Sequence, residues 1–485
     1  MSTSSKAAVR SLLTTDLARS VKTHRFPAHS VDAPSAYAHN AWRLGSVRTH
    51  GPLDLHRDRR AGTLLGMSVN VKTRIGHLLL ARSRKGFSLS TMPFVPSSLK
   101  MPLQRDALNP VAELGQRREA EPVSKLARLF GKNIWLVSGY EATQTVLADT
   151  ASYSNDIRPL VGWDGATAEG DIGGLGFTDP PQHTRLRKIL TPEFTMRRLE
   201  RLQPRIEEIV ERQLDAVQAA GPVADLVQTF AFPIPFSVIC ELLGLPDDDR
   251  AGFQRLGQAR FDVSNGGIGV FGAASESRSF LLAATRRQRV NPGDGLLGQI
   301  IKEHGDEVDD VELSGLADGV FTGGFETSAS MLALGAVVLL QNPDRFASLA
   351  DDPGDVDSVV EELLRYLTVV QVAFPRFARH DLELFGKKVS AGDVVGCSLS
   401  GANRDPRLGI DLDTFDPDRR PVSHLAFGHG FHRCIGAELA RMELRAAYPA
   451  LARRFPGMTL AIDPAELKFR GLSIVYGVDA VPVRL

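Results

Sequence analysis

From about residue 106 onward, apolar residues recur at helical spacing along most of the chain. The pattern predicts helices over 110–131 (with a break at a proline), 141–149, 183–190, 196–218, 230–246, 310–340 and 355–367. Short apolar runs predict strands over 133–140, 372–378, 382–389 and 393–399, and within 466–483. The run 310–340 is apolar nearly all round in its second half, as in a helix that is buried on every side. We therefore expect a mainly α fold with small β-sheets, in a single large domain with a long central helix.

Composition adds limits but no function. Apolar residues make up 43% and charged residues 24% of the 485 positions, which is ordinary for a soluble globular protein. Three cysteines cannot form a disulfide framework, so a reducing, cytoplasmic setting is expected. The sequence also holds no apolar run of about 18 residues, and we expect no membrane span.

The charges divide the chain at about residue 95. Residues 1–95 contain 15 Lys or Arg, 4 Asp, no Glu and 6 of the 12 His, whereas residues 96–485 carry a formal charge of −11. Three interpretations compete for the basic segment: a disordered arm, a targeting peptide, or translated sequence upstream of the true start. We favour a disordered or non-native extension. No nucleic-acid partner is expected, because the segment lacks interleaved aromatic residues and a recognisable motif.

The stretch FGHGFHRCIG (427–436) places Cys434 among glycines just ahead of a predicted helix. Cys240 and Cys397 lie in apolar surroundings and read as inert core residues. A zinc site with His429 and His432 would need further ligands, and no second Cys or His cluster lies near. A nucleophilic cysteine with a histidine base is a further alternative. Neither alternative accounts for the surrounding phenylalanine and glycines, whereas a flat iron macrocycle held by a thiolate does.

This stretch resembles the haem-binding loop of the cytochrome P450 family of haem-thiolate monooxygenases. The positions in register are Phe427, Gly428, Gly430, His432, Cys434 and Gly436. The resemblance implies haem b as cofactor, with Cys434 as the ligand of the iron. It covers residues 96–485, which would form the haem-thiolate monooxygenase domain, and leaves 1–95 unmatched.

The predicted long helix carries TGGFETSAS (322–330). Two adjacent glycines inside a helix cost roughly 1 kcal/mol each relative to alanine, so they need a reason. Close packing of another helix is one explanation, and a widened groove for dioxygen is the other. The segment is similar to the oxygen-activation helix of the family, which implies that Thr327 hydrogen-bonds the bound oxygen and that Glu326 helps to supply protons.

Two further groups follow the family's order. Glu362 and Arg365 are three residues apart and read alone as a solvated pair, but they resemble the family's buried Glu-x-x-Arg pair, with Arg419 as its partner. Arg420 stands where the family usually has an aromatic residue. The resemblance also implies that four residues hold the haem propionates: His183, Arg187, Arg376 and His432.

The family implies that two electrons come from outside the chain, and we expect ferredoxin and an NAD(P)H-dependent ferredoxin reductase as partners. A basic surface with Arg433, Arg441 or Arg445 could receive an acidic ferredoxin. The substrate is expected to be an apolar small molecule, bound with O2 by a monomer. Their positions relative to the family's motifs suggest the following residues as substrate contacts: Val320, Gly324, Val370, Phe374 and Ile474. Two alternatives stay open: a haem protein that binds ligand without turnover, and another haem-thiolate reaction such as oxidative coupling or peroxide-driven oxidation.

Overall fold

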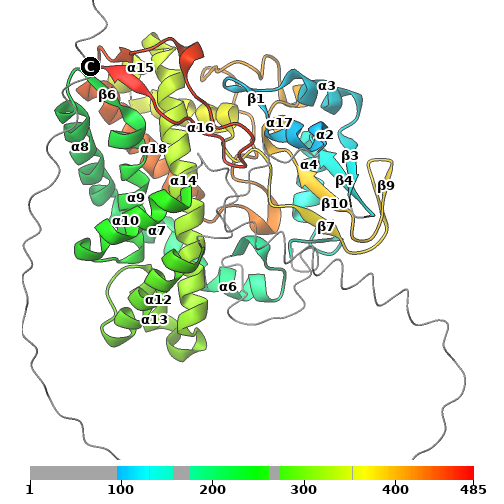
Figure 1. Ribbon diagram of the computed structural model, residues 1–485, viewed down its shortest axis with the longest axis horizontal. Coiled ribbons are helices and arrows are strands. Elements are labelled where there is room, and N and C mark those ends of the chain that lie inside the picture. Colours follow the sequence, from blue (N-terminus) through cyan, green and yellow to red (C-terminus); the bar gives the residue numbers. More distant parts are fainter. Residues whose placement is uncertain (1–95, 130, 157–174, 262–273, 352) are drawn as a thin grey trace, which may run out of the picture. The chain divides into compact units, whose positions relative to one another are not determined.

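The computed structural model describes residues 96–129, 131–156, 175–261, 274–351 and 353–485 (Figure 1). The basic segment 1–95, expected to be a disordered or non-native extension, lies outside the described residues. The long helices of the described part are α3 (Ala112–Ala120), α4 (Tyr140–Ala148), α6 (Gln182–Leu190), α8 (Gln203–Ala219), α9 (Pro233–Leu243), α10 (Asp247–Phe261), α12 (Ala274–Val290), α13 (Leu296–His304), α14 (Asp310–Leu340), α15 (Pro343–Asp351), α16 (Pro353–Leu367) and α18 (Ala437–Arg454). Short helices are α2 (Ser97–Lys100), α7 (Met196–Leu199) and α17 (Leu399–Ala402). The expected mainly α fold is confirmed.

The strands form small sheets, as expected. The largest has the order β3-β4-β10-β7-β5, in which β4 and β10 are parallel and the other pairs antiparallel. Its members are β3 (Val123–Leu129), β4 (Lys132–Val137), β10 (Val394–Cys397), β7 (Arg376–Ala378) and β5 (Tyr153–Ser154). A second sheet joins β11 (Thr459–Leu460), β12 (Pro482–Arg484) and β6 (Val223–Asp225). Two hairpins pair β1 (Arg105–Asp106) with β2 (Asn109–Pro110) and β8 (Leu382–Leu384) with β9 (Lys387–Val389).

The predicted long helix is α14, which contacts α9, α12, α15, α16 and α18 (Figure 1). Its first turn is capped by the Asp309 carboxylate, which accepts from the backbone N–H of Glu312 at 2.8 Å. By length and composition it could cross a membrane, but 72% of its most apolar window is buried inside the protein, as in a core helix. Close packing on α18 requires Gly335, because a Cβ there would lie 1.9 Å from the Tyr448 hydroxyl.

One predicted helix was wrong in its second half. Residues 110–131 form α3 and then β3, rather than a helix with a proline break. Pro122 ends the helical segment, and β3 pairs with β4 from Val123 to Leu129. The predicted helix 196–218 is likewise divided, since α8 restarts at Gln203 with a proline in its first turn.

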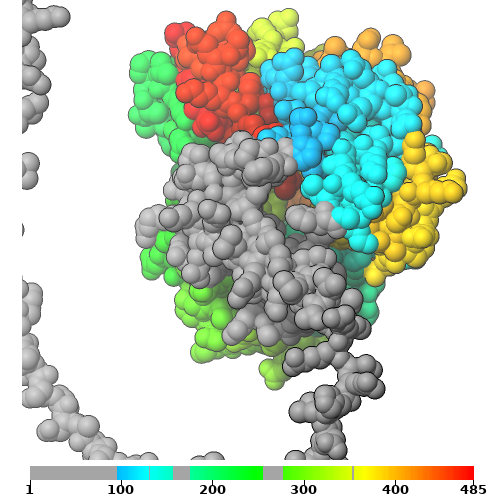
Figure 2. All heavy atoms as spheres, turned by 45° about the vertical axis from the view of Figure 1, so that its right-hand side comes forward, coloured from blue at the N-terminus to red at the C-terminus, as the bar shows by residue number. Residues whose placement is uncertain are grey.

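The C-terminal segment lies against the beginning of the described chain. The Tyr476 hydroxyl donates to the Ala107 carbonyl at 2.5 Å, and the Arg105 guanidinium lies 4.8 Å from the centre of the Tyr476 ring. In Figure 2 the first described residues (blue) accordingly lie beside the C-terminal segment (red). This contact holds residues 469–478 in place. They lie next to the site that is described below.

Candidate active site

The loop around Cys434 is a tight turn between the coil after α17 and the start of α18. The Cys434 N–H donates to the Phe427 carbonyl at 2.8 Å, and Gly428 N–H donates to Leu425 at 2.9 Å. Gly428 and Gly430 have φ of +70° and +67°, which disfavours any side chain. A Cβ at Gly430 would also lie 2.7 Å from the backbone of α4. These glycines are therefore required by the turn and by its approach to α4.

The three cysteines differ as expected. Cys240 and Cys397 are buried, and burial raises the pKa of both thiols to about 12. Cys434 is accessible, although surrounding protein still raises the pKa of its thiol. The Gly436 N–H and the nearby Arg187, Arg433 and Arg441 act in the opposite direction and favour the thiolate. Protein packing does not explain Gly436, because a Cβ there would meet only the Phe194 ring at 3.8 Å.

Four predicted anion-binding residues come together from three segments. The His183 and His432 rings lie 4.2 Å apart, and Arg187 and Arg376 both act on them electrostatically. Burial and these cations lower the pKa of His183 to about 4 and that of His432 to about 3. Within the described part of the chain, both ring nitrogens of His183 and Nε2 of His432 are buried without a hydrogen-bond partner. Such groups are costly unless an anionic acceptor pairs with them.

A hollow of about 300 Å³ adjoins this cluster. It is lined by His183, Thr184, Arg187, Lys188, Thr191 and Phe431. The lining belongs to one face of α6 and to the cysteine loop, so it forms one edge of the same site. Phe431 is exposed there, beside the His183 ring.

On α14 the two glycines have different surroundings. A Cβ at Gly324 would lie 2.6 Å from Ile239 of α9, so helix packing explains this glycine. A Cβ at Gly323 would meet no atom of the described residues within 4 Å. The Thr327 hydroxyl donates to the Gly323 carbonyl at 2.6 Å, a contact of the kind that bends helices. The open side of α14 is therefore at Gly323 and Thr327, and packing alone accounts for only one glycine.

The Glu326 carboxylate lies on the same turn and has a charged neighbour that the sequence did not indicate. Its Oε1 lies 3.6 Å from Nη1 of Arg470, a buried residue of the C-terminal segment. Because 144 positions separate the two in the chain, no local pattern could have paired them.

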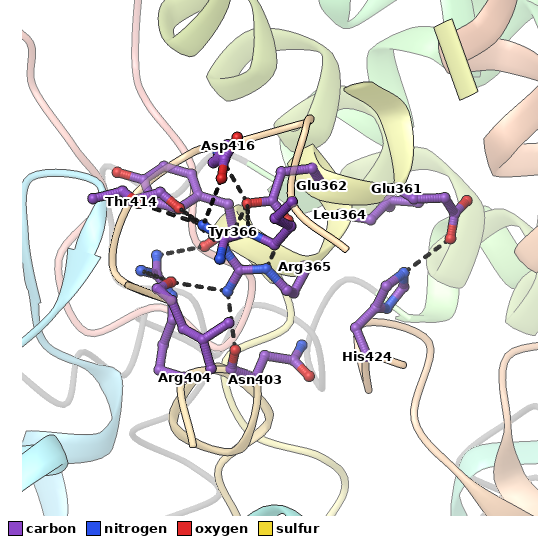
Figure 3. Close-up of polar contacts among 12 residues, drawn as sticks. Glu361, Glu362, Leu364, Arg365, Tyr366, Asn403, Arg404, Thr414, Asp416 and His424 are labelled. Carbon is purple, nitrogen blue, oxygen red and sulfur yellow. Dashed lines mark hydrogen bonds and ion pairs between the residues drawn. The ribbon is translucent and has the colours of Figure 1, made fainter. Parts of the chain in front are cut away.

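Glu362 and Arg365 form a buried network rather than a solvated pair (Figure 3). The Arg365 side chain is 1% exposed and donates to both Glu362 oxygens at 2.7 and 2.8 Å. Its other N–H groups donate to the carbonyls of Asn403, Leu412 and Thr414. Arg419 Nε donates to Glu362 Oε1 at 2.9 Å, in the position expected for the third member. The network joins α16 to the chain that leads into the cysteine loop.

A neighbouring pair of contacts was not predicted. Glu361 accepts from Arg441 of α18 at 2.5 and 2.9 Å. It also lies 3.1 Å from His424 (Figure 3). Burial would raise the pKa of Glu361, but these two hydrogen-bond partners lower it to about 2. Arg445 is likewise paired, with Asp357 at 2.6 Å. Of the three arginines suggested for docking a ferredoxin, two therefore already pair with carboxylates of this chain.

The suggested substrate contacts lie in separate segments, two of which the structure joins. Val370 forms an isolated bridge with Val475, and the Gln371 N–H donates to the Ile474 carbonyl at 2.9 Å. Ile474 is 60% exposed. Phe374 is 49% exposed, with its ring 4.6 Å from that of Phe177. Val320 of α14 is half-buried against the core. A further suggested contact is the part of the glycine-rich loop 161–181 near 173–177, of which only 175–177 falls within the described residues.

Comparison with known proteins gives consistent matches. Residues 356–468 match the family model described as Cytochrome P450. "Cytochrome P450 165C4" from Amycolatopsis orientalis is 43% identical, over 75% of this chain and 89% of that protein. "Cytochrome P450 monooxygenase PikC" from Streptomyces venezuelae is 37% identical, over 78% of this chain and 91% of its own.

A solved structure agrees. OxyC, described as a cytochrome P450 implicated in an oxidative C–C coupling reaction during vancomycin biosynthesis, superposes with a TM-score of 0.71 at 38% identity. The match covers 79% of this chain and 96% of OxyC.

Proposed function

This chain belongs to the cytochrome P450 family and is a haem-thiolate monooxygenase, and from that premise we propose that it uses haem b to oxygenate an apolar organic substrate. The observation that carries the proposal is the cysteine loop with its accessible thiol, next to buried imidazole nitrogens without partners. A thiolate and convergent cationic or N–H donors are what a haem with two propionates needs.

The residues fit that cofactor. Cys434 would ligate the iron, with the Gly436 N–H stabilising the thiolate. His183, Arg187, Arg376 and His432 would bind the propionates, and a propionate oxygen could accept from the single N–H of a neutral imidazole. Phe427 would support the cysteine loop through its contact with α18, since the Arg441 guanidinium lies 4.7 Å from its ring centre. Gly428 would allow the turn and Gly436 the approach of α18.

When bound, the haem supplies the redox chemistry that splits dioxygen and oxidises the substrate. The chain's own part is to place protons and exclude water. Thr327 donates its hydroxyl proton to the Gly323 carbonyl, so its oxygen lone pairs face the open side of α14 and can accept a proton or a hydrogen bond. Glu326, the residue before Thr327, would exchange protons through its carboxylate.

The substrate would bind against apolar side chains. The proposed contacts are Val320, Gly324, Val370, Phe374 and Ile474. Phe374 and Ile474 are exposed, so a hydrophobic ligand would bury their apolar surface on binding. Within the described residues, Gly324 packs on Ile239, so its contribution would be through the helix backbone.

Electrons would come from a ferredoxin and its reductase in the cytoplasm. The pairing of Arg441 and Arg445 leaves Arg433 and Lys188 as the accessible cations beside the cysteine loop. Charge reversal at Arg433 and Lys188 should weaken ferredoxin binding and reduce its salt dependence, because fewer charge contacts remain to be screened. Unchanged affinity and salt dependence would contradict this docking face. The match to OxyC favours oxidative coupling as a second candidate reaction.

The experiment uses the protein reconstituted with haem. Reduction under carbon monoxide should give the red-shifted absorption of a thiolate-ligated iron, and C434S should lose it. C397S is the matched control, since that thiol is buried and inert. Persistence of the band in C434S would refute the assignment.

Turnover under labelled dioxygen separates the two reactions. A probe panel of β-ionone, testosterone and a tyrosine-containing dipeptide is screened for a spectral shift, and the best binder is incubated with ferredoxin, reductase and NADPH. One labelled oxygen atom in the product supports monooxygenation, whereas an unlabelled coupled product supports the second candidate. Protein starting at Met92 should behave as the full chain does, because residues 1–95 are proposed to be dispensable.

A further inference from the structure

Arg470 is a buried cation whose guanidinium lies 5.5 Å from the centre of the Phe232 ring and whose hydrogen bonding is incomplete. It is 9% exposed, and its Nε and Nη1 have no hydrogen-bond partner among the described residues. Nη1 lies 3.6 Å from Glu326 Oε1, and Nε lies 3.6 Å from the exposed carboxylate of Asp479. Buried N–H groups without acceptors destabilise a fold, so an arginine that contributed only stability would be expected to have closer partners. Its charge is nevertheless placed beside the acid of α14.

The position of Arg470 depends on the hairpin formed by residues 468–479, here called the C-terminal hairpin. The Arg470 N–H donates to the Gly477 carbonyl at 2.9 Å, and Phe469 bridges to Val478. A Cβ at Gly477 would lie 3.0 Å from Ser330 Oγ of α14 and 3.2 Å from Arg470 Nη1. The glycine therefore lets this hairpin lie against α14 with the arginine between them.

The tip of the same hairpin carries a proposed substrate contact. Ile474 at the tip is 60% exposed, and its carbonyl accepts from the Gln371 N–H at 2.9 Å. The Gln371 side chain donates to the Ser473 carbonyl at 2.7 Å and accepts from Arg105 Nε at 2.7 Å. One short hairpin thus presents an apolar side chain at its tip and a buried cation at its base, next to Glu326.

We propose that Arg470 is a positioning residue for Glu326 and that it couples proton delivery to the placement of the C-terminal hairpin. The inference rests on the proposed function, in which Glu326 exchanges protons. The guanidinium attracts the Glu326 carboxylate across 3.6 Å, beyond hydrogen-bond length, so it biases the orientation of the carboxylate through charge. A substrate that displaces Ile474 shifts the arginine through the hairpin backbone, and the carboxylate responds.

The turnover test compares R470Q, which removes the charge, with R470K, which keeps it. K468Q is the matched control, because Lys468 is an exposed cation on the same hairpin strand. With the best binder of the probe panel, R470Q should lower the fraction of NADPH electrons recovered in product about tenfold, with KM changed by less than twofold. R470K should recover most of the loss, and K468Q should behave as the unaltered protein.

A double variant separates this inference from the proposed function. If Arg470 acts through Glu326, R470Q should add no further loss of coupling in an E326Q background. If E326Q alone leaves coupling unchanged, the proton role of Glu326 in the proposed function is wrong. If E326Q uncouples turnover but R470Q does not, the proposed function stands and the positioning role is refuted.

Two measurements do not depend on turnover. The thermal midpoints of R470Q, E326Q and the double variant should be non-additive, with the double variant less destabilised than the sum of the singles. In the unaltered protein, addition of the probe should change the rate of hydrogen exchange in residues 470–477 and also in α14 around Glu326. In R470Q, the change should not extend to α14. Additive midpoints, or exchange in α14 that responds equally in R470Q, would overturn the proposal.

Discussion

Replacing Arg365 by methionine should remove a large part of the stability of this protein. The change deletes five hydrogen bonds from a side chain that is 1% exposed. It leaves Glu362 with Arg419 as its remaining cation and leaves three buried carbonyls without this donor. Breaking a buried ion pair by removing one partner costs about 3–5 kcal/mol. A domain is typically stable by about 5–15 kcal/mol, so the loss would be a substantial fraction.

The measurement is equilibrium urea unfolding of the haem-reconstituted protein, followed by circular dichroism and by haem absorbance. R419M is the matched control, since Arg419 binds the same carboxylate from a more exposed position, and it should cost about 2 kcal/mol. A loss below about 1 kcal/mol in R365M would refute the reasoning.

Three further predictions concern the loop, α14 and acid stability. G430A should lower the free energy of unfolding by about 3 kcal/mol and weaken haem retention, because the left-handed backbone and the 2.7 Å approach to α4 both exclude a methyl group. G457A is the control, since a Cβ there would meet no described atom within 4 Å, and it should be nearly neutral. Both variants are measured by urea unfolding and haem absorbance. G323A should raise stability by up to about 1 kcal/mol through helix propensity while weakening carbon monoxide binding to the reduced protein; unchanged binding would place the open side of α14 elsewhere. The lowered pKa of Glu361, about 2 against an ordinary value of 4.5, contributes stability above pH 4.5 that is lost as pH falls toward 2. Because that side chain is 39% exposed, screening leaves about 1–2 kcal/mol, and urea unfolding of E361Q should show a correspondingly flatter acid limb.

The sequence was sufficient where local chemistry dictates the result. The sequence placed Cys434 among glycines just ahead of a predicted helix, and Gly428 and Gly430 do adopt the left-handed backbone that only glycine tolerates easily. The helical period of 310–340 predicted α14 over its whole length. Burial of the Glu362 and Arg365 pair followed only from the resemblance, since spacing alone favours a solvated pair.

The remaining features depend on contacts between distant segments. Residues 123–129 became a strand because β4 offered a pairing edge, which no helical period in the segment itself can show. Arg470 lies beside Glu326, and Glu361 beside Arg441, across 144 and 80 positions. The two glycines of α14 could not be told apart before their neighbours were known: Ile239 faces one, and the other has open space.

The contact of Gly335 with Tyr448 limits how this protein can be recombined with its relatives. The phenol oxygen of Tyr448 donates to the Met331 carbonyl at 2.6 Å and occupies the volume that a methyl group on residue 335 would need. A chimera that takes α14 from a relative with a larger residue at that position must also take α18, or its two longest buried helices will be forced apart. Crossover points between residues 340 and 437 should therefore fail more often than those that keep both helices from one parent.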